Sequence, residues 1–153
     1  MMLMKIVLCG SLAFQKEFDE IGEKLEKAGH LVLTSDTAED AKKKGITDIK
    51  KWLEQMKKFE SEKFIRYMAE KMKSHLEKIK SSDAILVVNL DKNGVKNYIG
   101  ASTLMEIGYA FEHGKRIFIL NPLNESLGGS EEIMAMKPSI LSGRLEMIRI
   151  PTM

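Results

Sequence analysis

Residues 83–120 read DAILVVNLDKNGVKNYIGASTLMEIGYAFEHGKRIFIL, and this stretch decides the fold of the chain. Ala84–Leu90 is apolar like a buried strand, residues 103–113 have the character of a helix, and Arg116–Leu120 is a second apolar strand. Strands alternating with helices predict a parallel sheet. In such a sheet, ligands bind beyond the carboxyl ends of the strands, where helix N-termini offer free N–H groups. Asp91 and Glu106 should therefore lie at the mouth of one crevice.

The same alternation extends over the rest of the chain. Met4–Cys9 and Leu31–Leu33 are expected to form the first two strands and Leu145–Ile150 the fifth, while apolar residues from Phe14 to Ala28 mark one face of a helix that Gly29 ends. The sequence predicts an α/β fold: a three-layer sandwich around a five-stranded parallel sheet of flavodoxin-like (Rossmann-like) type, with strand order 2-1-3-4-5. Without a repeat or a linker, residues 1–153 are expected to form a single domain.

A lysine-rich helical segment at about residues 37–80 separates the second strand from the third. We expect a break near Gly45 and, closer to the C-terminus, a short helix at Glu131–Met136 that Pro138 ends. Acidic residues are interleaved with the lysines, which favours a solvated face over a basic binding surface. The position of the segment after the second strand also suggests a lid over the site.

Composition excludes several classes of function. The 153 residues carry a net charge of +2, which is too small to predict a nucleic-acid partner. The single Cys9 cannot form an intramolecular disulfide, and with no recognisable signal peptide this favours a cytoplasmic setting. The apolar run at residues 6–9 is too short to span a membrane, so no membrane partner is expected.

The loop after the first strand contains Gly10 and Ser11. It lacks the glycine-lysine-serine ending of a P-loop, the three glycines of a dinucleotide fingerprint and the acidic pair of a phospho-receiver. Gly10 would let a ligand approach the backbone, and Ser11 could donate a hydrogen bond to it. Ser11 could equally serve only as the N-cap of the following helix.

The loop after the third strand carries more polar side chains. Asp91 could act as a general acid or bind a sugar hydroxyl, although Asp-Lys-Asn-Gly is also ordinary turn sequence. Candidate contacts to a sugar or phosphate are Asn97, Tyr98, Ser102 and Thr103. Thr103 and Glu106 also have the spacing of a capping box, in which the glutamate binds its own helix end. The alternative for Glu106 is a nucleophile that attacks an anomeric carbon, and spacing alone does not separate the two.

Three motifs resemble the nucleoside 2-deoxyribosyltransferase family, including its branch of 2'-deoxynucleoside 5'-monophosphate N-glycosidases. They are Val7-Leu8-Cys9-Gly10-Ser11, Ser82-Asp83-Ala84-Ile85-Leu86-Val87-Val88, and Thr103-Leu104-Met105-Glu106-Ile107-Gly108-Tyr109-Ala110 with Gly114-Lys115-Arg116 after it. The resemblance implies cleavage or transfer at the N-glycosidic bond of a 2'-deoxynucleoside or its 5'-monophosphate. It implies Glu106 as the nucleophile and no metal or organic cofactor.

The resemblance also implies roles for neighbouring residues. Gly10 and Ser11, with Ser102 and Thr103, would contact the phosphate or 5'-hydroxyl group, and Asp91 would orient the sugar or assist proton transfer. The partner would be a small-molecule nucleoside or nucleotide, and the assembly a homodimer or larger homo-oligomer. The chain departs from the family at Gly100, a candidate substrate-binding position where an aspartate is usual, and at Val7, near the usual place of a tyrosine.

Two other functions fit the same residues. Gly100-Ala101-Ser102-Thr103-Leu104-Met105-Glu106 is loosely similar to the motif of phosphoribohydrolases, which release bases from ribonucleoside monophosphates, but it contains fewer glycines. A nucleotide-binding or sensing module without catalysis would need Glu106 only as a helix cap.

Overall fold

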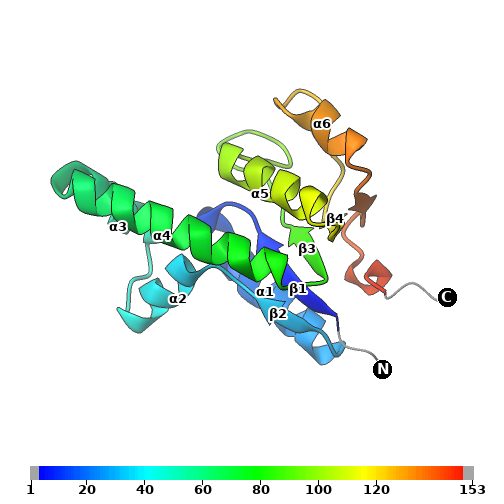
Figure 1. Cartoon of the computed structure of the whole chain (residues 1–153), viewed down its shortest axis with the longest axis horizontal. Coiled ribbons are helices and arrows are strands. Elements are labelled where there is room, and N and C mark those ends of the chain that lie inside the picture. Colours follow the sequence, from blue (N-terminus) through cyan, green and yellow to red (C-terminus); the bar gives the residue numbers. More distant parts are fainter. Residues whose placement is uncertain (1–3, 150–153) are drawn as a thin grey trace.

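A sheet of five parallel strands forms the centre of the computed structural model, which describes residues 4–149 (Figure 1). The strands are β1 (Lys5–Cys9), β2 (Leu31–Leu33), β3 (Ala84–Val87), β4 (Arg116–Ile119) and β5 (Ser139–Ile140). They are arranged in the order β2-β1-β3-β4-β5, and each neighbouring pair runs parallel. The predicted α/β sheet and its strand order are confirmed.

Alternating strand residues build a separate apolar core on each face of the sheet. On one face, Ile6 and Leu86 pack with Phe18 and Leu25 of α1 (Gln15–Lys27). On the other face, the strands meet α4 (Ser61–Lys80), α5 (Ala101–Glu112) and α6 (Ser130–Ala135) through apolar residues that include Val7, Ile85, Ile79, Ile107 and Ile133. These two helical layers and the sheet make the three-layer sandwich.

The lysine-rich segment folds into α2 (Asp36–Lys43), α3 (Ile49–Phe59) and α4. Gly45, with φ +67, lies in the first break, as predicted. A second break falls at Glu60, and there the chain reverses, so that α3 packs against the N-terminal part of α4. This α3–α4 hairpin extends beyond the edge of the sheet, whereas the C-terminal part of α4 lies on it (Figure 1).

Within residues 4–149, none of the helices combines the length and the apolar character that a membrane crossing requires.

The predicted position of the fifth strand is wrong. The strand that pairs with β4 is Ser139–Ile140, directly after Pro138, and residues 145–147 form a 3-10 helix. Leu145 and Ile148 pack against the core on the α1 face, which explains their apolar spacing without a strand. Ile150, the last residue of the predicted strand, lies outside the described residues.

A buried asparagine fixes the carboxyl ends of β3 and β4. Asn89 is 0% exposed, its Nδ2 donates to the Asn121 carbonyl oxygen at 2.9 Å, and its Oδ1 accepts from the Asn121 N–H at 2.9 Å. Asn121 Nδ2 in turn donates to the Asn89 carbonyl oxygen at 3.1 Å. Because these bonds pair backbone N–H and carbonyl groups of residues 89 and 121 with asparagine side chains, the loops after β3 and β4 leave the sheet in a defined position.

Gly10 allows the loop after β1 to lie close to the end of β3. A Cβ atom at Gly10 would come within 2.8 Å of the Val88 carbonyl oxygen and 3.2 Å of Phe18 Cζ, and its φ of +154 is unfavourable for other residues. The next residue, Ser11, therefore meets the loop after β3, where Lys92 Nζ donates to Ser11 Oγ at 2.9 Å.

We expect Gly10→Ala to lower the free energy of unfolding by roughly 1–3 kcal/mol, because the backbone oxygen of Val88 cannot move aside. Gly108→Ala in α5 is the control: a Cβ there meets no atom within 4 Å, so the variant should be neutral or more stable. Urea unfolding of both variants measures the difference, and equal stabilities would contradict the close approach at Gly10.

Candidate active site

A cavity of about 500 Å³ opens at the carboxyl ends of β1, β2 and β3. Its floor comes from the loop after β1 and from the first two turns of α5, and α3 and α4 supply the opposite wall. The strand order reverses at β1 and β3, which is where ligands bind in open α/β sheets. The α3–α4 hairpin is therefore part of the site.

Glu106 lies in the cavity and does not cap its helix. The N-cap of α5 is Gly100, and the Leu104 N–H is the donor to the Gly100 carbonyl oxygen at 3.0 Å. Thr103 is thus inside the helix, Glu106 follows in the second turn, and the capping-box interpretation is wrong. The Glu106 side chain lines the cavity and is 16% exposed.

Two buried side chains lie beside the Glu106 carboxylate, with the ligand atoms of all three within 4.8 Å of one another. His75 Nε2 of α4 lies 3.6 Å from Glu106 Oε1 and also 3.6 Å from Cys9 Sγ at the end of β1. The other ring nitrogen, Nδ1, is buried and has no hydrogen-bond partner among the described residues. These residues form a compact cluster, which we call the Glu106 cluster: Cys9, His75 and Glu106.

Burial sets the protonation states in the Glu106 cluster. It raises the pKa of Glu106 to about 7, with a smaller opposing effect from the Cys9 thiol. Burial lowers the pKa of His75 to about 4, so the imidazole is neutral at pH 7 and its contact with Glu106 is not an ion pair. Burial and the nearby Glu106 carboxylate raise the pKa of the Cys9 thiol. Glu106 consequently lies between its two protonation states near neutral pH.

Sequence reasoning missed His75 and Cys9 as parts of the site. The sequence predicted Cys9 only as the end of the first strand and placed His75 only within the lysine-rich helical segment, and both side chains are buried. The available signal was the position of Cys9 at the carboxyl end of a central strand, next to Gly10. The sequence offers no comparable signal for His75, because its proximity to Glu106 depends on how α4 crosses the sheet.

The N-terminus of α5 and the loop after β1 bring together several predicted contacts. Gly10, Ser11, Gly100, Ser102 and Thr103 all line the cavity. The first amides of α5, from residue 101 to residue 103, precede the first helical hydrogen bond. Ser11 Oγ accepts a hydrogen bond from the Ala13 N–H at 3.2 Å, so the predicted N-cap interaction is present. Lys92 Nζ donates a hydrogen bond to the same oxygen.

Tyr98 fills the space where a side chain at position 100 would begin. A Cβ atom at Gly100 would lie 2.7 Å from Tyr98 Oη and 3.2 Å from two ring carbons. Lys92 Nζ is 4.8 Å from the centre of the same ring, a cation–π geometry. Tyr98 lines the cavity as predicted, and its hydroxyl group is the polar atom next to Gly100.

The structure does not bring Asp91 and Asn97 to this cavity. Both line a second hollow of about 990 Å³ beside the loops that follow β3 and β4. Asp91 Oδ1 accepts from the Asn97 N–H at 3.0 Å, and Asn97 Nδ2 donates to the Pro122 carbonyl oxygen at 2.9 Å. Their contacts shape the loop, and their roles toward a substrate stay predictions.

Helix α2 holds α4 in place over the cavity. Asp36 accepts hydrogen bonds from Ser74 and Lys78, and Asp40 accepts from Tyr67 at 2.7 Å and pairs with Lys71 at 3.0 Å. The hydrogen bonds from Lys78 and Ser74 lower the pKa of Asp36, and those from Tyr67 and Lys71 lower that of Asp40. Residues on both sides of His75 are thereby fixed.

The Glu106 cluster also has the chemistry of a zinc site. Its sulfur, nitrogen and oxygen ligand atoms all lie within 4.8 Å of one another. A histidine that binds zinc usually donates its other ring N–H to a carboxylate or carbonyl group, and His75 Nδ1 has no such partner in the described residues. The three ligand types fit a zinc ion, but the hydrogen bond that usually orients a zinc-binding histidine is missing at His75 in the described residues.

No protein-family model matches the sequence, and no curated protein matches it significantly. A solved structure with a similar fold is that of a 2-deoxyribosyltransferase from the psychrotolerant bacterium Bacillus psychrosaccharolyticus, with a TM-score of 0.52 and 20% identity over 81% of this chain and 77% of that chain. Another is the CMP N-glycosidase BcmB of Clostridium botulinum, with a TM-score of 0.48 and 13% identity over 89% and 84% of the two chains.

We expect Glu106→Gln to stabilise the fold increasingly as the pH rises. Since the pKa of Glu106 is about 7 in the fold and 4.5 is its ordinary value, the wild type loses stability between these pH values, by up to about 3 kcal/mol. The neutral glutamine avoids this loss, whereas the effect of His75 on stability is common to both proteins.

Denaturant unfolding at pH 4.5, 6 and 8 measures the difference. The gain should be small at pH 4.5 and largest at pH 8. Glu112→Gln, an exposed position of the same helix, should show no such trend. A gain that does not change with pH would mean that Glu106 ionises freely in the folded protein.

Proposed function

We propose that this protein cleaves or transfers the N-glycosidic bond of a 2'-deoxynucleoside or its 5'-monophosphate, with Glu106 as the nucleophile. The observation that carries the proposal is the placement of Glu106, a partly buried carboxylate that lines a cavity and does not bind its own helix end. The motif around Glu106 and the fold shared with a 2-deoxyribosyltransferase support the same chemistry.

The reaction follows from this placement. A carboxylate oxygen of Glu106 forms a bond to C1', the C1'–N bond breaks, and its electron pair leaves with the base. In hydrolysis, the oxygen of a water molecule then binds C1' and the ester C1'–O bond breaks, which restores the carboxylate. The two hydrogens of that water end on the departed base and on the new 1'-hydroxyl group, so no further reactant is needed.

The transition state develops positive charge on the sugar, and the ionised carboxylate lies beside it. At neutral pH the Glu106 carboxylate has no cationic partner in its cluster, because His75 is neutral. The sugar cation therefore supplies the attraction that the resting site lacks. We assign His75 and Cys9 as positioning residues that hold the carboxylate toward C1'.

The opposite end of the substrate would lie at the start of α5. Ser11, Lys92 and the free amides of residues 101–103 suit a 5'-hydroxyl or 5'-phosphate group. The hydroxyl groups of Tyr98 and Ser102 would form hydrogen bonds with the sugar. A homodimer or larger homo-oligomer stays a prediction from the family resemblance, which sedimentation equilibrium would test.

We expect Glu106→Gln to release base from 2'-deoxynucleoside monophosphates about a thousandfold more slowly than the wild type, or slower still. Glu112→Gln should keep the wild-type rate. Chromatography of the released base measures both, and the rate should be the same with and without a metal chelator, because the mechanism uses no metal.

Three outcomes would contradict this assignment. Equal release by Glu106→Gln and wild type would exclude the nucleophile, and a strict preference for ribonucleoside monophosphates would favour a phosphoribohydrolase. Nucleotide binding without base release in the wild type would indicate a sensing module.

We expect kcat/KM to rise with pH up to about 7 and then to level off, because only the ionised Glu106 can attack. The measurement should use an unphosphorylated deoxynucleoside, since a phosphate group titrates near pH 6. The neighbouring His75 has a pKa of about 4, so its titration should not change kcat/KM above pH 5. A rate constant that is flat from pH 5 to pH 8 would show that Glu106 is already ionised in the free protein.

A further inference from the structure

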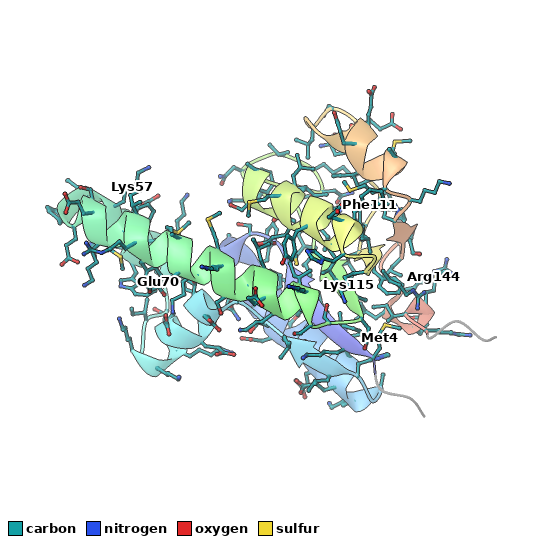
Figure 2. All side chains as sticks on the ribbon, viewed as in Figure 1. Met4, Lys57, Glu70, Phe111, Lys115 and Arg144 are labelled. Atoms are coloured by element: carbon teal, nitrogen blue, oxygen red, sulfur yellow. The ribbon has the colours of Figure 1, made fainter. Side chains whose placement is uncertain are left out.

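The cavity extends well beyond the space around Glu106. On α4 its wall runs from His75 to Phe64, and eleven residues of helix correspond to roughly 16 Å. On α3 it continues to Lys57, which Figure 2 places near the far end of the α3–α4 hairpin. A sugar bound at Glu106 with one phosphate at Ser11 would leave the part of the cavity beside Lys50 and Lys57 unfilled.

The outer part of the cavity carries positive charge. Four lysines and two glutamates line the whole cavity: Lys50, Lys57, Lys71, Lys92, Glu54 and Glu106. Lys71 is paired with Asp40 at 3.0 Å. In the part of the chain that the structure describes, no acidic side chain lies within ion-pair distance of the other three lysines.

These three lysines extend from the inner end of the cavity to its outer end. Lys92 binds Ser11 Oγ at 2.9 Å, next to the start of α5. Helix α3 packs against the 3-10 helix Leu12–Phe14, which follows Ser11 directly. Lys50 is the second residue of α3, and Lys57 lies two turns further along the same face.

Apart from its lysines, Glu54 and His75, the wall that α3 and α4 supply is apolar. Leu53 of α3 and Phe64, Met68 and Met72 of α4 line the cavity between the lysines and His75. Apolar side chains of this size suit the face of a base, whereas they offer nothing to a phosphate group. The lysines therefore mark where anionic groups would lie.

We propose that the substrate carries a chain of two or three phosphates on its 5' oxygen, as a nucleoside 5'-diphosphate or 5'-triphosphate does. The first phosphate would lie at Ser11 and Lys92, and the following ones would extend toward Lys50 and Lys57. The proposal rests on the proposed function for the position of the sugar at Glu106. Glu54 lies between Lys50 and Lys57 on the same face of α3, so the three lysines and this glutamate leave two net positive charges that anionic groups would meet.

The test is equilibrium binding to the Glu106→Gln variant, in which turnover does not interfere. We expect affinity to rise from the 2'-deoxynucleoside monophosphate to the diphosphate and triphosphate, by up to about fivefold for each new lysine–phosphate pair. Adding Lys50→Gln and Lys57→Gln should remove most of this rise. Lys51→Gln with Lys58→Gln is the matched control, because these residues lie on α3 with the same charge and do not line the cavity.

Equal affinity for the monophosphate and the triphosphate would overturn the inference, and so would an equal loss in the two double variants. A dinucleotide should bind more weakly than the triphosphate, because its second nucleoside replaces a terminal phosphate; tighter binding would also overturn it. Base release by the wild type separates the two proposals. Binding that depends on Lys50 and Lys57 without any base release would support the phosphate chain and refute the reaction.

Discussion

A carboxyl group that is largely removed from water, such as that of Glu106 in the second turn of α5, needs compensation, because burying a charge costs free energy unless the charge is paired. Glu106 receives little in the resting protein. Its neighbours are a neutral imidazole and a protonated thiol, and the pKa of about 7 follows from that environment. A substrate that becomes positive at C1' would provide the missing partner at the moment of reaction. Interactions that strengthen only in the transition state are those that accelerate a reaction.

The scaffold around the Glu106 cluster is built to keep these three side chains together. Cys9 comes from the central strand β1, and Glu106 comes from a helix whose Ile107 and Ala110 are fully buried against the sheet. His75 is fixed from two directions, because Ile79 anchors α4 in the core while the acidic residues of α2 bind side chains on both sides of it. The Glu106 cluster therefore depends on α4, which precedes β3 in the sequence, and on α5, which follows it.

The fold was predictable because its strands are short apolar runs separated by helices, and burial on both faces leaves few other arrangements. The fifth strand was misplaced because residues 145–150 are rich in apolar side chains. Leu145 and Ile148 are three residues apart, which is the spacing of one face of a 3-10 helix and not of a strand. The break at Glu60 has no glycine or proline to announce it, although the apolar spacing changes between Phe59 and Phe64. In the cavity, local motifs had pointed to Glu106 and Ser11. The position of His75 was not predictable in this way, because it depends on how α4 crosses the sheet.

The loop after β3 shows most directly why adjacency in sequence does not define a site. Asp91 and Lys92 are neighbours, yet Asp91 lines the hollow near β4 and Lys92 lines the cavity with Glu106. A short antiparallel bridge between Lys92 and Val95 turns the chain here, and Asn89 fixes the start of the loop. Residues of this loop line both hollows, so the successive side chains of Asp91 and Lys92 point into different ones. A carboxylate at position 91 is thus directed away from the cavity, while position 92 delivers a positive charge to Ser11. The polar group closest to Gly100 comes instead from Tyr98, at the other end of the same loop.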